Sequence, residues 1–173
     1  MDDIEIVKQN SSNRDVILEE VKKKGTLLEW ASKELQDDKQ VVIEAVKQDG
    51  GALEFASDRL KDDKDVLLNS LDKVGWVICY ASDRLKDDKD VVLKAAKNDG
   101  QSLYFAGQSL RADKEVVLEA VKNKAIILKY ASKDLRNDKE VAIAAISQNK
   151  KSLSYISDEL KKDEDILKIL NPE

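Results

Sequence analysis

Glycine recurs in this chain at a fixed interval of 25 residues, and no other feature constrains the fold as strongly. Four of the six glycines lie on that interval: Gly25, Gly50, Gly75 and Gly100. The single proline is Pro172, so nothing earlier in the chain forbids a helix. Regularly spaced glycines are typical of recurring helix C-caps, where glycine supplies a left-handed backbone. The spacing therefore predicts a helical repeat protein.

Aligning the chain with itself at this interval matches nearly every position from residue 13 onward. The first column is Asn13, Asp38, Asp63, Asp88, Asp113, Asp138 and Asp163. An aromatic column contains Trp30, Phe55, Tyr80, Phe105, Tyr130 and Tyr155, followed by Ala31, Ala56, Ala81, Ala106, Ala131 and Ile156. The columns define six repeats, which start at residues 13, 38, 63, 88, 113 and 138. We expect a single domain in which an irregular N-terminal cap (1–12) precedes the repeats (13–162) and a partial repeat or C-terminal capping helix (163–173) follows them.

Each repeat is predicted to contain two helices. In the repeat that starts at Asp38, this residue is the expected N-cap of a first helix, which ends near Gly50. A second helix is expected over 52–60, with Leu53 and Leu60 on one face and Phe55 nearly opposite. Both helices therefore need packing partners on more than one side.

Short helices with two apolar faces are marginal by themselves in water, and stacking of successive repeats would bury both faces. The alanine column would let neighbouring helices approach closely. We therefore predict an all-α fold, an α-solenoid (superhelical array) of 25-residue two-helix repeats.

The repeat unit also resembles a known family. From Asp38 to Leu60 and again from Asp88 to Leu110 it approximates D-K-(D/E)-V-V-L-x-A-V-K-x-x-G-x-x-L-x-(F/Y/W)-A-S-x-x-L, which is similar to the tandem repeats of domain of unknown function 4116. The resemblance covers about residues 13 to 170 and rests on capping and core residues. It implies the fold and an interaction module, and it transfers no activity or ligand residue. Four residues depart from the pattern. Ala125 and Lys150 stand where the pattern has glycine, Gly107 stands where it has serine, and Ile156 stands where it has alanine.

The composition removes most familiar active sites. There is no histidine and the only cysteine is Cys79, which excludes Ser-His-Asp and Cys-His catalysis, imidazole or multi-thiolate zinc sites and an internal disulfide. Acidic clusters such as residues 61–65 have the composition of calcium ligands, yet Asp63 is explained as a helix cap. We expect no enzyme, no cofactor and no metal site.

Charge favours a protein partner over nucleic acid. The formal net charge is −5, whereas phosphate contacts supply most nucleic-acid affinity. Residues 121–151 are basic, however, so RNA or phosphate binding through this segment stays open as a second alternative. Lysines near the ends of the first helices, such as Lys122, are explained by the helix dipole.

Positions that vary between repeats are the best candidates for a binding surface, because architecture determines the others. One variable column reads Thr26, Gly51, Trp76, Gln101, Ile126 and Lys151, and another reads Glu29, Glu54, Cys79, Tyr104, Lys129 and Ser154. Tryptophan and tyrosine are enriched in binding hot spots. The candidate partner-binding residues are Trp76, Tyr104, Ile126 and Lys129, although packing against a neighbouring helix would also explain the apolar ones.

Taken together, these patterns favour a non-enzymatic repeat scaffold that binds a protein or peptide. The first alternative is a structural spacer within a longer array. The chain opens with an acidic segment, and no apolar run approaches the length of a membrane span. We expect a soluble, cytoplasmic or otherwise intracellular protein with no membrane partner, and secretion without a standard signal stays open.

Overall fold

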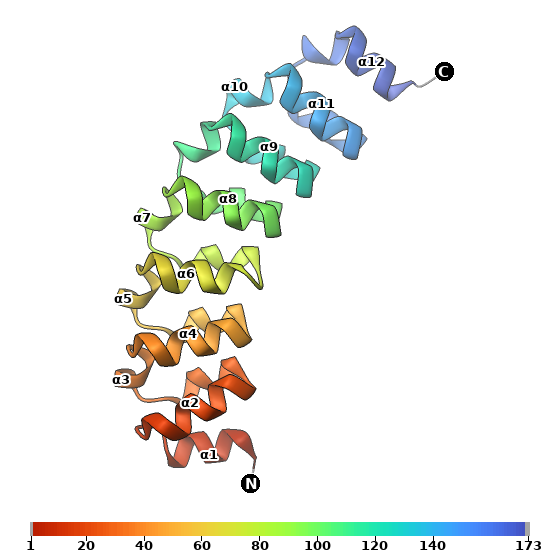
Figure 1. Cartoon of the computed structure of the whole chain (residues 1–173). Helices are drawn as coiled ribbons and strands as arrows, with labels where there is room; N and C mark the ends of the chain where they lie inside the picture. The colour runs from red at the N-terminus through yellow and green to blue at the C-terminus, as the bar shows by residue number, and fades with distance from the viewer. Residues whose placement is uncertain (1, 172–173) are drawn as a thin grey trace. The chain divides into compact units, whose positions relative to one another are not determined.

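The computed structural model describes residues 2–171, so Pro172, which could stop the last helix, lies outside the described residues. All of the regular structure in the described part is helical (Figure 1). The longer helices are α1 (Asp3–Gln9), α2 (Arg14–Lys23), α4 (Lys39–Gln48), α6 (Lys64–Leu71), α8 (Lys89–Asn98), α9 (Lys114–Asn123), α11 (Lys139–Gln148) and α12 (Glu164–Leu170). From α2 onward these helices begin 25 residues apart, and the predicted all-α repeat fold is confirmed.

Short helices connect the longer ones. A 3₁₀ helix follows the α-helix of every repeat: η1 (Gly25–Trp30), η2 (Gly50–Phe55), η3 (Gly75–Tyr80), η4 (Gly100–Tyr104), η6 (Ala125–Tyr130) and η7 (Lys150–Tyr155). A further turn of helix then leads to the next repeat: α3 (Lys33–Gln36), α5 (Asp58–Lys61), α7 (Asp83–Lys86), η5 (Leu110–Ala112), α10 (Lys133–Arg136) and η8 (Leu160–Lys162).

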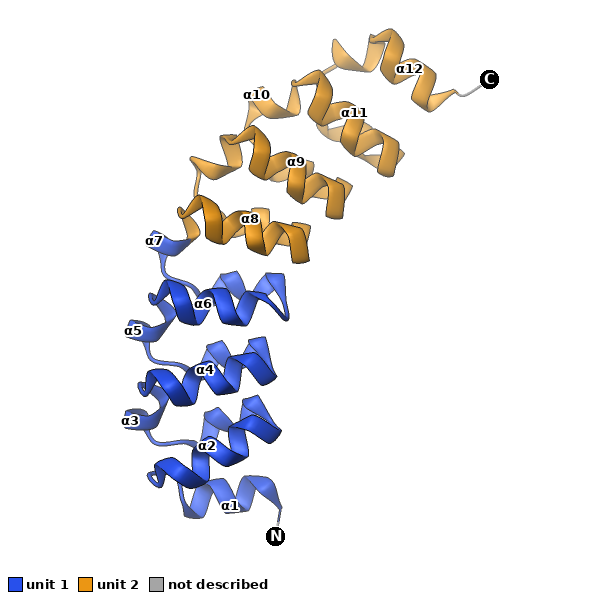
Figure 2. Ribbon diagram, viewed as in Figure 1, with its two compact units in different colours: residues 1–85 blue, residues 86–173 orange. Residues whose placement is uncertain are grey.

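The chain divides into two compact units, residues 1–85 and residues 86–173 (Figure 2). In the first unit α4 packs between α2 and α6, and η2 packs between η1 and η3. In the second unit α9 packs between α8 and α11, α12 packs on α11, and η6 lies between η4 and η7. Each unit is therefore a layer of α-helices covered by a layer of 3₁₀ helices, with successive repeats side by side.

The core of each unit lies between these layers. In the repeat from Asp38, Val42, Ala45 and Val46 of α4 and Leu53 of η2 are fully buried. In the second unit Val117, Ala120 and Leu128 occupy equivalent positions and are equally buried. The aliphatic columns of the repeat thus form one continuous core within each unit, and burial of that apolar surface is the main force that holds neighbouring repeats together.

The caps of the long helices follow the prediction. The carboxylate of Asp38 accepts hydrogen bonds from the backbone N–H groups of Gln40 and Val41, each at 3.0 Å. Asn13, Asp63, Asp88, Asp113, Asp138 and Asp163 cap the corresponding helices. A side-chain acceptor at the N-cap satisfies backbone donors that the first helical turn leaves unpaired.

The same capping aspartates also pair with the preceding repeat. Arg14 Nε lies 2.8 Å from Asp38 Oδ2, and Lys114 Nζ lies 2.8 Å from Asp138 Oδ2. The pattern recurs between Lys39 and Asp63, Lys89 and Asp113, and Lys139 and Asp163. The hydrogen bond from Arg14 holds the pKa of Asp38 below its ordinary value. Each of these aspartates is thus both a cap and a link between repeats.

The predicted second helix over 52–60 is wrong, because that segment is broken in its middle. Ala56 and Ser57 are extended, with φ/ψ of −67°/156° and −61°/157°, between η2 and α5. The break frees the backbone N–H of Ser57, which donates to the Gln36 carbonyl of the preceding repeat at 3.0 Å. A continuous helix would use that donor internally. Equivalent bonds join Ser32 to Ser11, Ser82 to Lys61, Gly107 to Lys86 and Ser132 to Arg111.

The predicted left-handed glycine caps are also wrong, since no described residue has a positive φ. Close packing explains Gly25, Gly50 and Gly100 instead. A Cβ atom on Gly50 would lie 2.5 Å from the carbonyl oxygen of Ser70 in the next repeat. A Cβ atom added to Gly25 or Gly100 would likewise come too close to a backbone carbonyl oxygen of the next repeat. Ala125 occupies this position in a later repeat, where it is buried and has no positive φ, so the position does not require the special φ of a glycine.

Gly107 replaces the usual serine, but the contacts that this serine makes with the preceding repeat are kept. Its backbone N–H still donates to the Lys86 carbonyl, at 2.9 Å. The carboxylate of Asp87 occupies the space that a side chain at 107 would need, and it accepts a hydrogen bond from Ser109 Oγ at 2.9 Å. In the first unit the corresponding carboxylate, that of Asp37, accepts a hydrogen bond from the hydroxyl of Ser57, the residue equivalent to Gly107.

Candidate functional site

The two variable columns of the sequence lie together on the 3₁₀ helices. Their members are three residues apart, and in a 3₁₀ helix, with three residues per turn, side chains at i and i+3 lie one above the other. Trp76 and Cys79 share one face of η3 in this way, and Ile126 and Lys129 share one face of η6. Trp76 is 40% exposed and Tyr104 is 50% exposed. The variable positions therefore form the outer surface of the 3₁₀ layer in each unit, which we call the 3₁₀ face.

The aromatic column borders the same face. We expected the segment that carries Phe55 to be packed on two sides, whereas Phe55 is only half-buried, as are Tyr80, Phe105, Tyr130 and Tyr155. Trp30 is exposed, with Lys8 Nζ 4.0 Å from its ring centroid. The aromatic residues are thus only partly buried in the core, and their exposed parts belong to the 3₁₀ face.

In the first unit the 3₁₀ face carries charges of both signs. Trp76 meets Tyr80 edge to face, with ring centroids 5.9 Å apart. A wide, open hollow lies between η1 and η2 and exposes both acidic and basic side chains, namely Glu29, Lys33, Glu54, Asp58 and Lys61. A surface of this kind discriminates poorly between ligands of opposite charge.

The phenol of Tyr80 is unusual among the groups on this face. Burial, together with a hydrogen bond to the Glu54 carboxylate, raises the pKa of Tyr80 to about 12. Because the folded protein holds this proton more tightly than the unfolded chain, Tyr80 stabilises the fold below the ordinary pKa of 10.0. That contribution is lost as the pH rises from about 10 to about 12.

A titration followed by the ultraviolet absorbance of tyrosinate should reveal this group. We expect an ionisation near pH 12 that the Tyr80→Phe substitution removes. Glu54→Gln keeps the shape of the side chain and removes its charge, so it should shift the same ionisation to lower pH. An ionisation near pH 12 that persists in Tyr80→Phe would contradict the assignment.

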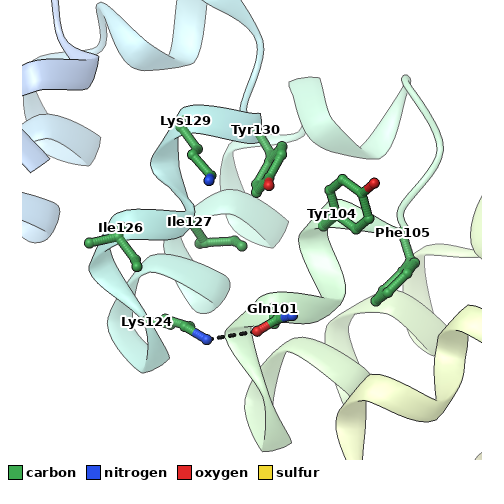
Figure 3. A pocket seen from close by; sticks show the side chains of 8 residues that line it. All are labelled: Gln101, Tyr104, Phe105, Lys124, Ile126, Ile127, Lys129 and Tyr130. Atoms are coloured by element: carbon green, nitrogen blue, oxygen red, sulfur yellow. Dashed lines mark hydrogen bonds between the residues drawn. The ribbon is translucent and has the colours of Figure 1, made fainter.

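In the second unit the 3₁₀ face has a smaller and more enclosed hollow of about 220 Å³ between η4 and η6 (Figure 3). Tyr104 stands between Phe105 and Tyr130, with ring centroids 4.9 and 4.8 Å away. At one rim Lys124 Nζ donates to Gln101 Oε1 at 2.7 Å and joins the two repeats. The lining is Gln101, Tyr104, Phe105, Lys124, Ile126, Ile127, Lys129 and Tyr130.

Two further hollows continue this surface. Tyr130 lines the first hollow and also a second one beside Arg111 and Lys133. Lys133 in turn lines a third hollow with Arg136 and Tyr155. The three hollows therefore lie in series in the second unit, from the 3₁₀ face onto η5 and α10, and their charged lining residues are all lysines and arginines. The next hollow shares Asn137 and Ser157 with the third one and includes Glu159 and Asp163.

The structure brings together three of the four predicted binding residues. Tyr104, Ile126 and Lys129 line the first hollow, whereas Trp76 belongs to the other unit. Sequence analysis missed Tyr130, because its aromatic column was explained by packing alone. The available signal was the position of Tyr130 one residue after the variable Lys129.

The capping aspartates Asp38, Asp63, Asp113, Asp138 and Asp163 are engaged at helix N-termini and in ion pairs with the preceding repeat. Within residues 2–171 no group of three or more His, Cys, Asp or Glu side chains is arranged to hold a metal ion. Helices long and apolar enough to cross a membrane are also absent from this part of the chain.

Comparison with known proteins adds a family. The family model described as Domain of unknown function (DUF4116) matches the chain four times, over residues 13–61, 38–82, 63–111 and 113–161. No curated protein and no solved structure matches the chain. The matches span the repeats that carry both the core columns and the 3₁₀ face.

Proposed function

Because this chain belongs to the family of domain of unknown function 4116, whose description names no activity, we propose its role from geometry: it is a scaffold that binds a protein or peptide on its 3₁₀ face. One observation carries the proposal. Large aromatic side chains stand at least partly exposed on consecutive 3₁₀ helices, although aliphatic residues of the same helices are fully buried.

The backbone that presents these side chains is held by several sets of contacts. Leu103 and Leu128 anchor η4 and η6 in the core, and the backbone of Ser132 is tied to Arg111 of the preceding repeat at 2.8 Å. A partner would therefore meet a preformed surface, and little conformational entropy would be lost on the scaffold side. Aromatic anchors on a rigid support are typical of binding hot spots.

A selection from an unbiased display library of random peptides tests this proposal. The bait is the full chain, and the selected peptides are then measured against Trp76→Gln/Tyr104→Ser/Ile126→Thr. Each new residue already occupies the same column in another repeat, as Gln101, Ser154 and Thr26 do, so the fold should tolerate it. We expect affinity to fall by about tenfold or more, since hot-spot truncations each cost about 2 kcal/mol or more.

A matched variant changes the opposite layer. Lys47→Gln/Lys97→Ser/Lys122→Thr alters three exposed residues of α4, α8 and α9 and should bind as the wild type does. Melting curves of all three proteins establish that the fold is unchanged. Failure to enrich any peptide, or peptides that bind the 3₁₀-face variant as tightly as the wild type, would overturn the proposal in favour of a structural spacer.

A further inference from the structure

We propose that the three hollows in series in the second unit, which run from the 3₁₀ face onto η5 and α10, bind an acidic peptide segment that places one apolar side chain against Tyr104. This inference rests on the proposed function and adds the chemical class of the partner. Tyr104, Lys129, Tyr130 and Lys133 are its central residues.

Unneutralised charge is the first argument. Lys124, Lys129, Lys133, Arg111 and Arg136 line the hollows, and among the described residues none of them has a carboxylate within ion-pair distance. Elsewhere in the same unit Lys89, Lys114 and Lys139 each pair with two carboxylates of the next repeat. A protein of net charge −5 thus has a row of cations with no acidic partner.

The row of unpaired lysines and arginines is complementary in charge to the carboxylates of an acidic partner. Potentials of opposite sign steer association and select the partner. Arg111 and Arg136 offer planar guanidinium groups that suit carboxylates. Their Nε atoms are buried and have no hydrogen-bond partner within residues 2–171, so a carboxylate of the partner would have to contact the other guanidinium nitrogens. The corresponding hollow of the first unit mixes Glu29, Glu54 and Asp58 with lysines and lacks this selectivity.

The size of the first hollow indicates which kind of side chain the partner places next to its acidic residues. Its volume of about 220 Å³ lies below the roughly 300–1,000 Å³ of small-molecule sites, so it suits one side chain better than a whole cofactor. Ile127 at its base is 3% exposed, and Ile126 and the Tyr104 ring are accessible beside it. An apolar residue next to acidic ones meets both requirements of the surface.

Ring geometry favours a peptide over single-stranded RNA. Base stacking needs an open aromatic face. Tyr104 contacts Phe105 and Tyr130 at interplanar angles of 75° and 62°, and Lys129 Nζ lies 4.7 Å from the centroid of Tyr130. Phe105 and Tyr130 are half-buried, so Tyr104 is the one exposed ring of the three and the hollow has no row of exposed rings on which successive bases could stack.

Fluorescence anisotropy with defined probes tests the inference. The main probe is a labelled peptide with one leucine followed by a run of glutamates. The comparison probes replace glutamate by glutamine, leucine by serine, or the peptide by a labelled oligouridine. We expect the leucine–glutamate peptide to bind the full chain about tenfold more tightly than either altered peptide, and more weakly as salt rises.

Charge reversal locates the site. The double substitution Lys129→Glu/Lys133→Glu should lower the affinity of the protein for the leucine–glutamate peptide by about tenfold or more. Lys97→Glu/Lys122→Glu makes the same change in net charge on α8 and α9, outside the hollows, and should have at most a small effect. Both reversals affect exposed side chains, and melting curves check that each variant folds.

Three results would overturn this inference: equal affinity for the glutamine peptide, equal loss in both charge-reversal variants, or preferential binding of oligouridine. None of these results touches the broader proposal, which fails only if the random-library selection yields no peptide sensitive to the 3₁₀-face variant. A selection that returns neutral sequences bound to this face would reject the acidic partner and keep the scaffold.

Discussion

Replacing Leu128 with alanine is expected to lower the free energy of unfolding by about 2–5 kcal/mol. Leu128 has no exposed surface, and η6, which carries it, packs against α9 and α11. Its removal leaves a cavity next to the helices of two repeats, which relax only partly around it. Urea unfolding followed by circular dichroism measures the effect.

The same substitution at Leu153 is the matched control. Leu153 occupies the equivalent position of the last full repeat, but it is only half-buried. Because less apolar surface leaves water there on folding, Leu153→Ala should cost distinctly less than Leu128→Ala. Equal costs at the two sites would mean that burial within the stack does not govern stability.

Replacing Gly50 with alanine is expected to destabilise the protein by about 1–3 kcal/mol, the usual cost of forcing an additional methyl group into packed structure. The new Cβ would lie 2.5 Å from the Ser70 carbonyl oxygen and 3.4 Å from the Lys73 Cβ. Backbone atoms cannot rotate away as a flexible side chain can, so the two repeats would have to move apart. Thermal and urea unfolding of the variant measure the loss.

The adjacent glycine provides a control one residue away. A Cβ on Gly51 would approach only the side chain of Asp49, with its nearest atom at 3.1 Å, and Gly51 has no positive φ. Gly51→Ala should therefore be neutral or stabilise by up to about 1 kcal/mol, since alanine restricts the unfolded chain. If Gly50→Ala were as well tolerated as Gly51→Ala, close packing would not explain the glycine column.

Much of the candidate site follows from the sequence, and part of it does not. Variation between repeats identified Tyr104, Ile126 and Lys129, which meet in one hollow. The same reasoning grouped them with Trp76, which lies in the other unit. Tyr130 was missed because an invariant aromatic column has the same pattern whether its rings are buried or half-exposed.

The sequence by itself determined the helical repeat, its 25-residue length, the aspartate caps and the aliphatic core. These features depend on contacts within a few residues, or on a period that recurs along the chain, and both are visible in one dimension. Asp38 caps its helix because the donors it satisfies lie two and three residues later.

Only the tertiary structure decided where the second helix breaks, why Gly50 lacks a side chain and which lysines keep an unpaired charge. Each depends on an atom in the neighbouring repeat: the Gln36 carbonyl for Ser57, the Ser70 carbonyl for Gly50, and the Asp138 carboxylate for Lys114. Lys129 and Lys133 meet no carboxylate in the described structure, because the stacking of repeats places Lys129 on the 3₁₀ face and Lys133 on α10, and neither lies beside the next aspartate. Local pattern cannot distinguish them from their paired counterparts, since charge neutralisation is a property of distance in three dimensions.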